Sequence, residues 1–199
     1  MAISIQMLEM MKDSNNLKNV NAGNDIVLGN KETIENHYHQ KNKTRLGILF
    51  EKLNSEFENQ EEISGIIDDL NRYTIQRDVI GLEQKLTESN RTDLINDALW
   101  LKEEYYKKLT KYQLYQSAQK IQAHLLASVL ERFRNKIKPL INSDSSDAVI
   151  RKAISEEIIN PLINLVEIEG LDDNILGFSA TDIEGMIYYL TGRCHLKWI

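Results

Sequence analysis

Four histidines and one cysteine are the side chains of this 199-residue chain best suited to metal binding or nucleophilic chemistry. His37 and His39 are separated by one residue, so on a strand they would point to one face, as metal ligands can. Two ligands do not make a site, and no further His or Cys cluster is evident. His124 lies beside an apolar helical stripe. Cys194 and His195 are adjacent, which on an extended segment directs them to opposite faces, so we expect a buried, unreactive cysteine.

Signatures of an enzyme are absent from the sequence. It has no phosphate-binding loop, no dinucleotide fingerprint and no HExxH motif. Helical RNA-cleaving toxins often place an Arg about five residues before a His on one helix, whereas Arg193 and His195 are too close. The sequence therefore predicts no enzyme, no metal site and no cofactor. A divergent helical toxin nuclease, acting on RNA or DNA, stays open as an alternative if a cleft holds two or more of the histidines.

Charge argues against non-specific nucleic-acid binding. The chain has 24 Lys and Arg against 30 Asp and Glu, a net charge of -6, while such binding depends on neutralising phosphates. Two local basic clusters, 107–111 and 132–138, keep a helical nucleic-acid-binding protein open as a second alternative. Cations near helix ends are the competing explanation for both clusters.

The elements that must position these residues fall into three segments. Residues 1–20 are expected to be a flexible N-terminal segment. Residues 21–40 predict a β-hairpin around Gly29 and Asn30, because both residue types tolerate the positive φ of a tight turn. Residues 41–199 predict a helical assembly domain, giving an all-α fold with a small N-terminal β-hairpin.

Apolar residues at helical spacing predict the bundle. One helix is expected to use Leu46, Leu49, Phe50, Leu53 and Phe57, a second Ile63, Ile66, Ile67, Leu70 and Tyr73, and a short third Leu82 and Leu86. From Leu94 to Ile137 the pattern continues without Gly or Pro, which predicts one long helix. A break near Thr110 into two helices is the alternative.

The C-terminal residues predict a capped helix and an extended tail. Thr181 and Glu184 fit a capping box, and Gly192 fits a left-handed C-terminal cap. The tail has two interpretations: Trp198 anchors it on a partner, with Arg193 and Lys197 as polar contacts, or Trp198 packs on its own bundle.

Three stretches, 21–30, 80–121 and 185–198, are together similar to a known family. They contain the pattern N-x-A-G-x-D-I-x-x-G-N, the segments IGLEQKL and YQSAQKI, and the closing run GMIYYLTGRCHLKW. Over residues 21–199 the chain resembles the C-terminal domains of bacterial ABC-three-component systems, the group that includes Lamassu-type antiphage defence. The resemblance implies a non-catalytic domain that ties an effector to an SMC-like ABC ATPase, which senses foreign DNA, with a middle component.

These considerations predict an interaction module and its contact residues. The hairpin would contribute Asp25, Gly29 and Asn30, and the tail Arg193, His195, Lys197 and Trp198. Long amphipathic helices favour a homo-oligomer. No signal peptide and no apolar run of about 20 residues is present, so a cytoplasmic location and no membrane association are expected.

Overall fold

The computed structural model describes residues 43–78, 80–171 and 173–199. Throughout this part of the chain the secondary structure is helical and contains no strand, so the predicted all-α fold is confirmed there. The segments predicted at 1–20 and 21–40, with Asp25, Gly29, Asn30, His37 and His39, lie outside the described residues. The helices are α2 (Arg45–Asn59), α3 (Asp68–Thr74), α4 (Leu82–Glu88), α5 (Ile95–Lys111), α6 (Gln116–Arg132), α7 (Lys138–Asn142), α8 (Asp147–Ile154), α9 (Asn160–Glu169) and α10 (Ala180–Gly192).

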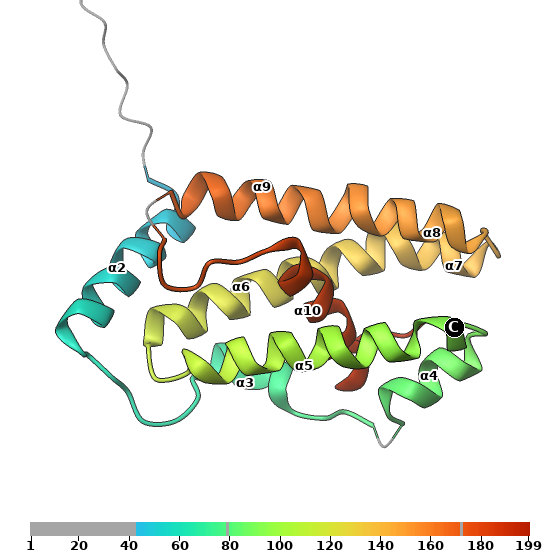
Figure 1. Ribbon diagram of the computed structural model, residues 1–199, viewed down its shortest axis with the longest axis horizontal. Coiled ribbons are helices and arrows are strands. Elements are labelled where there is room, and N and C mark those ends of the chain that lie inside the picture. The colour runs from blue at the N-terminus through green and yellow to red at the C-terminus, as the bar shows by residue number, and fades with distance from the viewer. Residues whose placement is uncertain (1–42, 79, 172) are drawn as a thin grey trace, which may run out of the picture. The chain divides into compact units, whose positions relative to one another are not determined.

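Helix α10 lies in the middle of the bundle (Figure 1), because it is apolar on nearly every side. It packs most extensively against α5. Gly185 makes this crossing possible: a Cβ there would lie 2.5 Å from the carbonyl oxygen of Leu101 and 2.8 Å from the Cβ of Tyr105. The buried residues of α10 include Ile183, Met186, Ile187, Tyr188, Tyr189 and Leu190.

The predicted long helix from Leu94 to Ile137 is wrong, since the chain turns between α5 and α6 (Figure 1). The break is stabilised by groups from a distant helix. Glu56 on α2 accepts hydrogen bonds from the backbone N–H (2.9 Å) and the hydroxyl (2.7 Å) of Ser117, capping the start of α6. A carboxylate at a helix N-terminus satisfies free N–H groups and favours the helix dipole. The observed turn follows the predicted alternative near Thr110.

Gln119 fixes the loops around this turn. Its side chain is fully buried on α6. The amide nitrogen donates to the carbonyl oxygens of Gly65 and Gln113, and the amide oxygen accepts from the N–H of Ile67 at 2.8 Å. These polar groups of the two loops thus find a partner, as burial requires.

Two π-helical segments extend helices across prolines. Segment η2 (Phe133–Ile137) joins α6 to α7, and η3 (Ser155–Ile159) joins α8 to α9. Pro161 has no N–H to donate to the preceding turn. The carbonyl oxygen of Glu157, four residues earlier, instead accepts a hydrogen bond from the Arg132 guanidinium at 2.8 Å. A side chain from the neighbouring helix thus replaces the missing backbone donor.

Both predicted caps of α10 are displaced in the sequence. The capping box is formed by Ser179 and Asp182, not by Thr181 and Glu184: the N–H of Ser179 donates to the Asp182 carboxylate at 2.8 Å. The left-handed residue after the helix is Cys194, with φ 66°, and not Gly192. The N–H of the next residue, His195, closes the cap by donating to the carbonyl oxygen of Leu190 at 2.8 Å.

Candidate interaction groove

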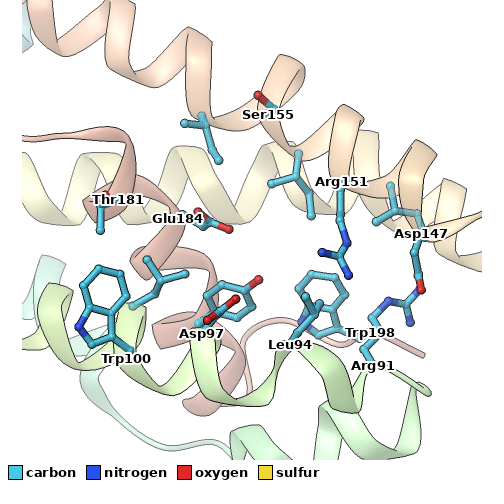
Figure 2. Close-up of a pocket in the computed structure, with 15 residues that line it drawn as sticks. Arg91, Leu94, Asp97, Trp100, Asp147, Arg151, Ser155, Thr181, Glu184 and Trp198 are labelled. Carbon is cyan, nitrogen blue, oxygen red and sulfur yellow. The ribbon is translucent and has the colours of Figure 1, made fainter.

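An open groove of about 510 Å³ runs along the bundle. Helix α5 forms one wall, α8 and η3 form the other, and α10 lies at the base (Figure 2). Apolar side chains from both walls line it: Leu94, Leu101, Ile150, Ile154 and Ile159. A groove of this size with an apolar lining and a few polar groups has the character of a binding site.

Two ion pairs tie the walls together at one end of the groove. Arg91 reaches the carboxylate of Asp147 at 3.3 Å, and Arg151 reaches that of Asp93 at 2.5 Å. The second pair is more than half exposed on both sides, so it contributes at most about 1 kcal/mol to stability. Both arginines that line the groove are therefore already paired with an acid.

Asp97 on α5 and Glu184 on α10 lie near the middle of the groove (Figure 2). Burial raises the pKa of the Glu184 carboxyl, the negative charge of Asp97 raises it further, and the charge of Arg151 opposes the rise. In the described part of the chain neither carboxylate forms an ion pair of 4 Å or less. Two carboxylates in one groove whose charges act on each other favour a cationic ligand.

Trp100 is on α5, as is Asp97, and it lies beside the two acids in the groove (Figure 2). Its side chain is 58% exposed. The buried residues of α5 are Ala98, Leu101, Tyr105 and Leu109, so Trp100 lies off its core-facing stripe. Large exposed aromatics are characteristic of binding surfaces. The sequence prediction missed Trp100, although a tryptophan on the polar face of an amphipathic helix is a readable signal.

The C-terminal tail contributes one side chain, Trp198, to the lining of the groove. Trp198 is 2% exposed and lines the groove with its ring under the Arg91 guanidinium, 5.6 Å away. Its ring also stacks on Tyr188 and meets Phe133 edge-on. The interpretation of Trp198 as an anchor inserted into a partner does not fit this burial. The structure agrees with the alternative, in which Trp198 packs on its own bundle.

Of the other predicted tail residues, His195 and Lys197 line one cavity beside η2, and Arg193 does not. Arg193 lies over the ring of Tyr189 at 5.5 Å, Lys197 is exposed, and His195 is buried. The neighbouring Cys194 is buried, and its thiol donates to the carbonyl oxygens of Asp78 and Ile80. The structure thus brings His195 and Lys197 together, but not with Arg193 or with Trp198, which lines the groove.

The histidines do not gather within the described residues. His124 is exposed and lines a cavity with α2 and α3, whereas His195 lines another cavity beside η2. In the same part of the chain, no group of three or more His, Cys, Asp or Glu side chains is placed to hold a metal ion. No helix there is long and apolar enough to cross a membrane.

The described residues therefore form an all-helical domain, with an open groove lined by apolar side chains, by acids and by two arginines paired with acids. A family model described as C-terminal domain 9 of the ABC-three component (ABC-3C) systems matches residues 81–198. The chain belongs to this family, so the resemblance predicted from sequence is confirmed. The matched segment begins just before α4 and contains every residue that lines the groove. No curated protein and no solved structure matches the chain.

Proposed function

We propose that this chain is a non-catalytic interaction module of a bacterial antiphage system. In this role it tethers an effector to an SMC-like ABC ATPase sensor, as in Lamassu-type defence, and works in the cytoplasm. Membership of the ABC-three-component family supports the proposal, because it implies partner components. The observation that carries it is the groove where exposed Trp100 stands beside Asp97 and Glu184.

The chemistry of the groove specifies the partner segment. The two carboxylates would accept an Arg or Lys side chain, whose charge would relieve their mutual repulsion. Trp100 would cover the apolar part of that side chain or stack on its cation. The apolar walls would take flanking aliphatic side chains. The predicted occupant is therefore a partner segment with a basic residue between apolar ones.

The test is co-purification of the tagged chain with the other components of its system. Trp100→Glu places a third negative charge in the groove and removes the aromatic surface, so recovery of the partner should fall at least about ten-fold, the equivalent of about 1.4 kcal/mol. Leu171→Glu is the matched control, because Leu171 is 83% exposed and lies outside the groove. Equal recovery with both variants would exclude the groove as the docking site.

Self-association is a separate part of the proposal. We expect a homo-oligomer in which the hairpin predicted at 21–40 contributes contacts, measured as the mass of the full chain by light scattering. Deletion of residues 1–39 should lower that mass. An unchanged mass would remove the N-terminal segment from the assembly, while the groove variants would still test partner docking independently.

A further inference from the structure

A second cavity, of about 320 Å³, opens beside the C-terminal tail and is lined by cations. Arg134 from η2, Lys138 from α7, Lys197 from the tail and Arg77 from the segment after α3 all line it. Arg77 is held there by its backbone N–H, which donates to the carbonyl oxygen of Arg193 at 3.2 Å. Four positive side chains from four separate elements thus meet at one cavity of a chain whose net charge is negative.

The basic run 132–138 is divided by the fold into two sets. Arg132 and Lys136 both contact Glu157. Arg132 donates to the backbone carbonyl oxygen of Glu157, and the ammonium of Lys136 lies 3.8 Å from the Glu157 carboxylate. Arg134 and Lys138 line the cavity instead. Favourable placement of cations near helix ends could account for Arg134 and Lys138, but not for Arg77 and Lys197, which come from other parts of the chain and line the same cavity.

Three of the four cations of the cavity lack acidic partners among the described residues. None of Arg77, Arg134 and Lys197 makes an ion pair there, whereas Lys138 donates to a backbone oxygen of Ile199. Like charges gathered without counter-charges repel one another. A bound anion would remove this repulsion.

His195 supplies an independent indication of a ligand at the same cavity. It is 6% exposed, lines the cavity, and neither ring nitrogen forms a hydrogen bond within the described part of the chain. Burial lowers the pKa of His195, with the charges of Arg77 and Arg134 acting in the same direction, while weak hydrogen bonding to the backbone of Ile75 and Tyr73 opposes them. These two backbone contacts do not reach the geometry of a regular hydrogen bond, so the ring nitrogens still lack a well-formed partner. A buried donor without a well-formed partner destabilises the folded protein. An anion in the cavity would accept from the imidazole.

We propose that this cavity binds a phosphate group, carried by a nucleotide or by a nucleic-acid strand. Phosphate suits the site because Arg and Lys are its preferred protein ligands and its oxygens accept several hydrogen bonds at once. Buried His195 forms the inner part of the site, Lys138 is half-buried, and the exposed Arg77, Arg134 and Lys197 form its rim. This site is separate from the Trp100 groove and does not depend on the docking proposal.

The experiment measures phosphate binding by the full chain in two arms, ATP followed by thermal shift and a short fluorescein-labelled single strand followed by polarisation. The test variant is Arg134→Gln with Lys197→Gln, both exposed side chains. Lys43→Gln with Lys152→Gln removes the same net charge from surface residues outside the cavity and outside both basic clusters. Circular dichroism checks that both variants are folded.

We expect saturable binding in at least one arm, weakened at least about ten-fold by the cavity variant and less than about two-fold by the control. For the strand, the cavity variant should also reduce the slope of log affinity against log salt by about 1 for each phosphate that it no longer neutralises. The arm that binds identifies the carrier of the phosphate. Binding in neither arm, or equal weakening by both variants, would overturn the proposal.

A second readout addresses His195 directly. In a chain with labelled histidines, ATP or the single strand, whichever binds, should shift the ring signals of His195 and leave those of His124 unchanged, since the two line different cavities. His195→Gln assigns the signal. A shift of every histidine signal, or of none, would contradict a site at this cavity.

Discussion

The indole Nε1 of Trp198 donates a hydrogen bond to the hydroxyl of Thr191 at 3.0 Å, inside the bundle. The same hydroxyl donates to the carbonyl oxygen of Ile187 at 2.8 Å. The carbonyl oxygen of Thr191 accepts from the buried ammonium of Lys85 on α4. One threonine therefore joins the last turn of α10, the tail and α4.

Thr191→Val should destabilise the protein by about 1–3 kcal/mol, because it keeps the side-chain shape but leaves the buried indole N–H without an acceptor. Urea unfolding followed by tryptophan fluorescence measures the change. Thr110→Val is the control: its hydroxyl also donates to the carbonyl four residues earlier but is exposed, so it should change stability by less than about 0.5 kcal/mol.

Gly185→Ala should destabilise the protein by about 2 kcal/mol or more, since the added methyl meets the α5 backbone at 2.5 Å. Thermal and urea unfolding measure the decrease. Gly192→Ala tests whether the effect is specific to this crossing: its Cβ would lie 3.4 Å from the flexible Lys102 side chain. A decrease as large at Gly192 as at Gly185 would refute the close-packing explanation.

Arg132→Met should cost about 1–2 kcal/mol, because it removes the donor to the carbonyl oxygen of Glu157. In a Pro161→Ala background the same change should cost less, since the alanine N–H supplies a backbone donor in that turn. A double-mutant cycle on unfolding free energies measures the coupling. Additive effects would show that Arg132 acts independently of Pro161.

Stability should fall as the pH is lowered below about 6.5, the ordinary pKa of histidine. The pKa of His195 is lowered in the folded state, so the unfolded chain binds the proton first and is favoured by acid. The charges of Arg77 and Arg134 responsible for part of the shift do not change in this range. Unfolding free energies measured from pH 7.5 to about pH 5.5 should show the slope.

His195→Gln should flatten that pH dependence, whereas His124→Gln should leave it unchanged because His124 is exposed. An equal slope in the wild type and both variants would assign the acid sensitivity to other groups.

Glu184→Gln should separate stability from binding. Removing its charge ends the repulsion with Asp97 and the cost of burying a carboxylate, so the melting temperature should stay the same or rise. Recovery of the partner should fall, since half of the proposed cation site is removed. Unchanged recovery would exclude Glu184 from the docking site without affecting the phosphate-site proposal.

Local apolar patterns predicted the helices well where each helix is amphipathic. Leu46, Phe50 and Leu53 lie on the buried face of α2 as expected. The second helix was predicted from Ile63 but begins only at Asp68, because Gly65 adopts a φ of +86° and interrupts it. Glycine permits that conformation at little cost, and a helical stripe alone does not reveal it.

Features determined by distant residues were not predictable in the same way. The turn before α6 depends on the Glu56 carboxylate, 61 residues from Ser117, and no local pattern contains that contact. The sequence left both interpretations of Trp198 open and favoured packing on its own bundle over anchoring a partner, because composition alone does not tell which surface covers a terminal aromatic. The groove was missed for the same reason: α5 and α10 bring Asp97 and Glu184 together only through the fold.

The bonds at Thr191 also close a ring. Lys85 stands near the start of the segment matched by the family and Trp198 at its end, and both terminate on the same residue. Thr191 thus joins the two ends of the segment directly, through its hydroxyl to Trp198 and through its carbonyl oxygen to Lys85. Changes of length in the turns between these ends need not separate them, because this link and the packing of Trp198 on Tyr188 and Phe133 hold the tail in place.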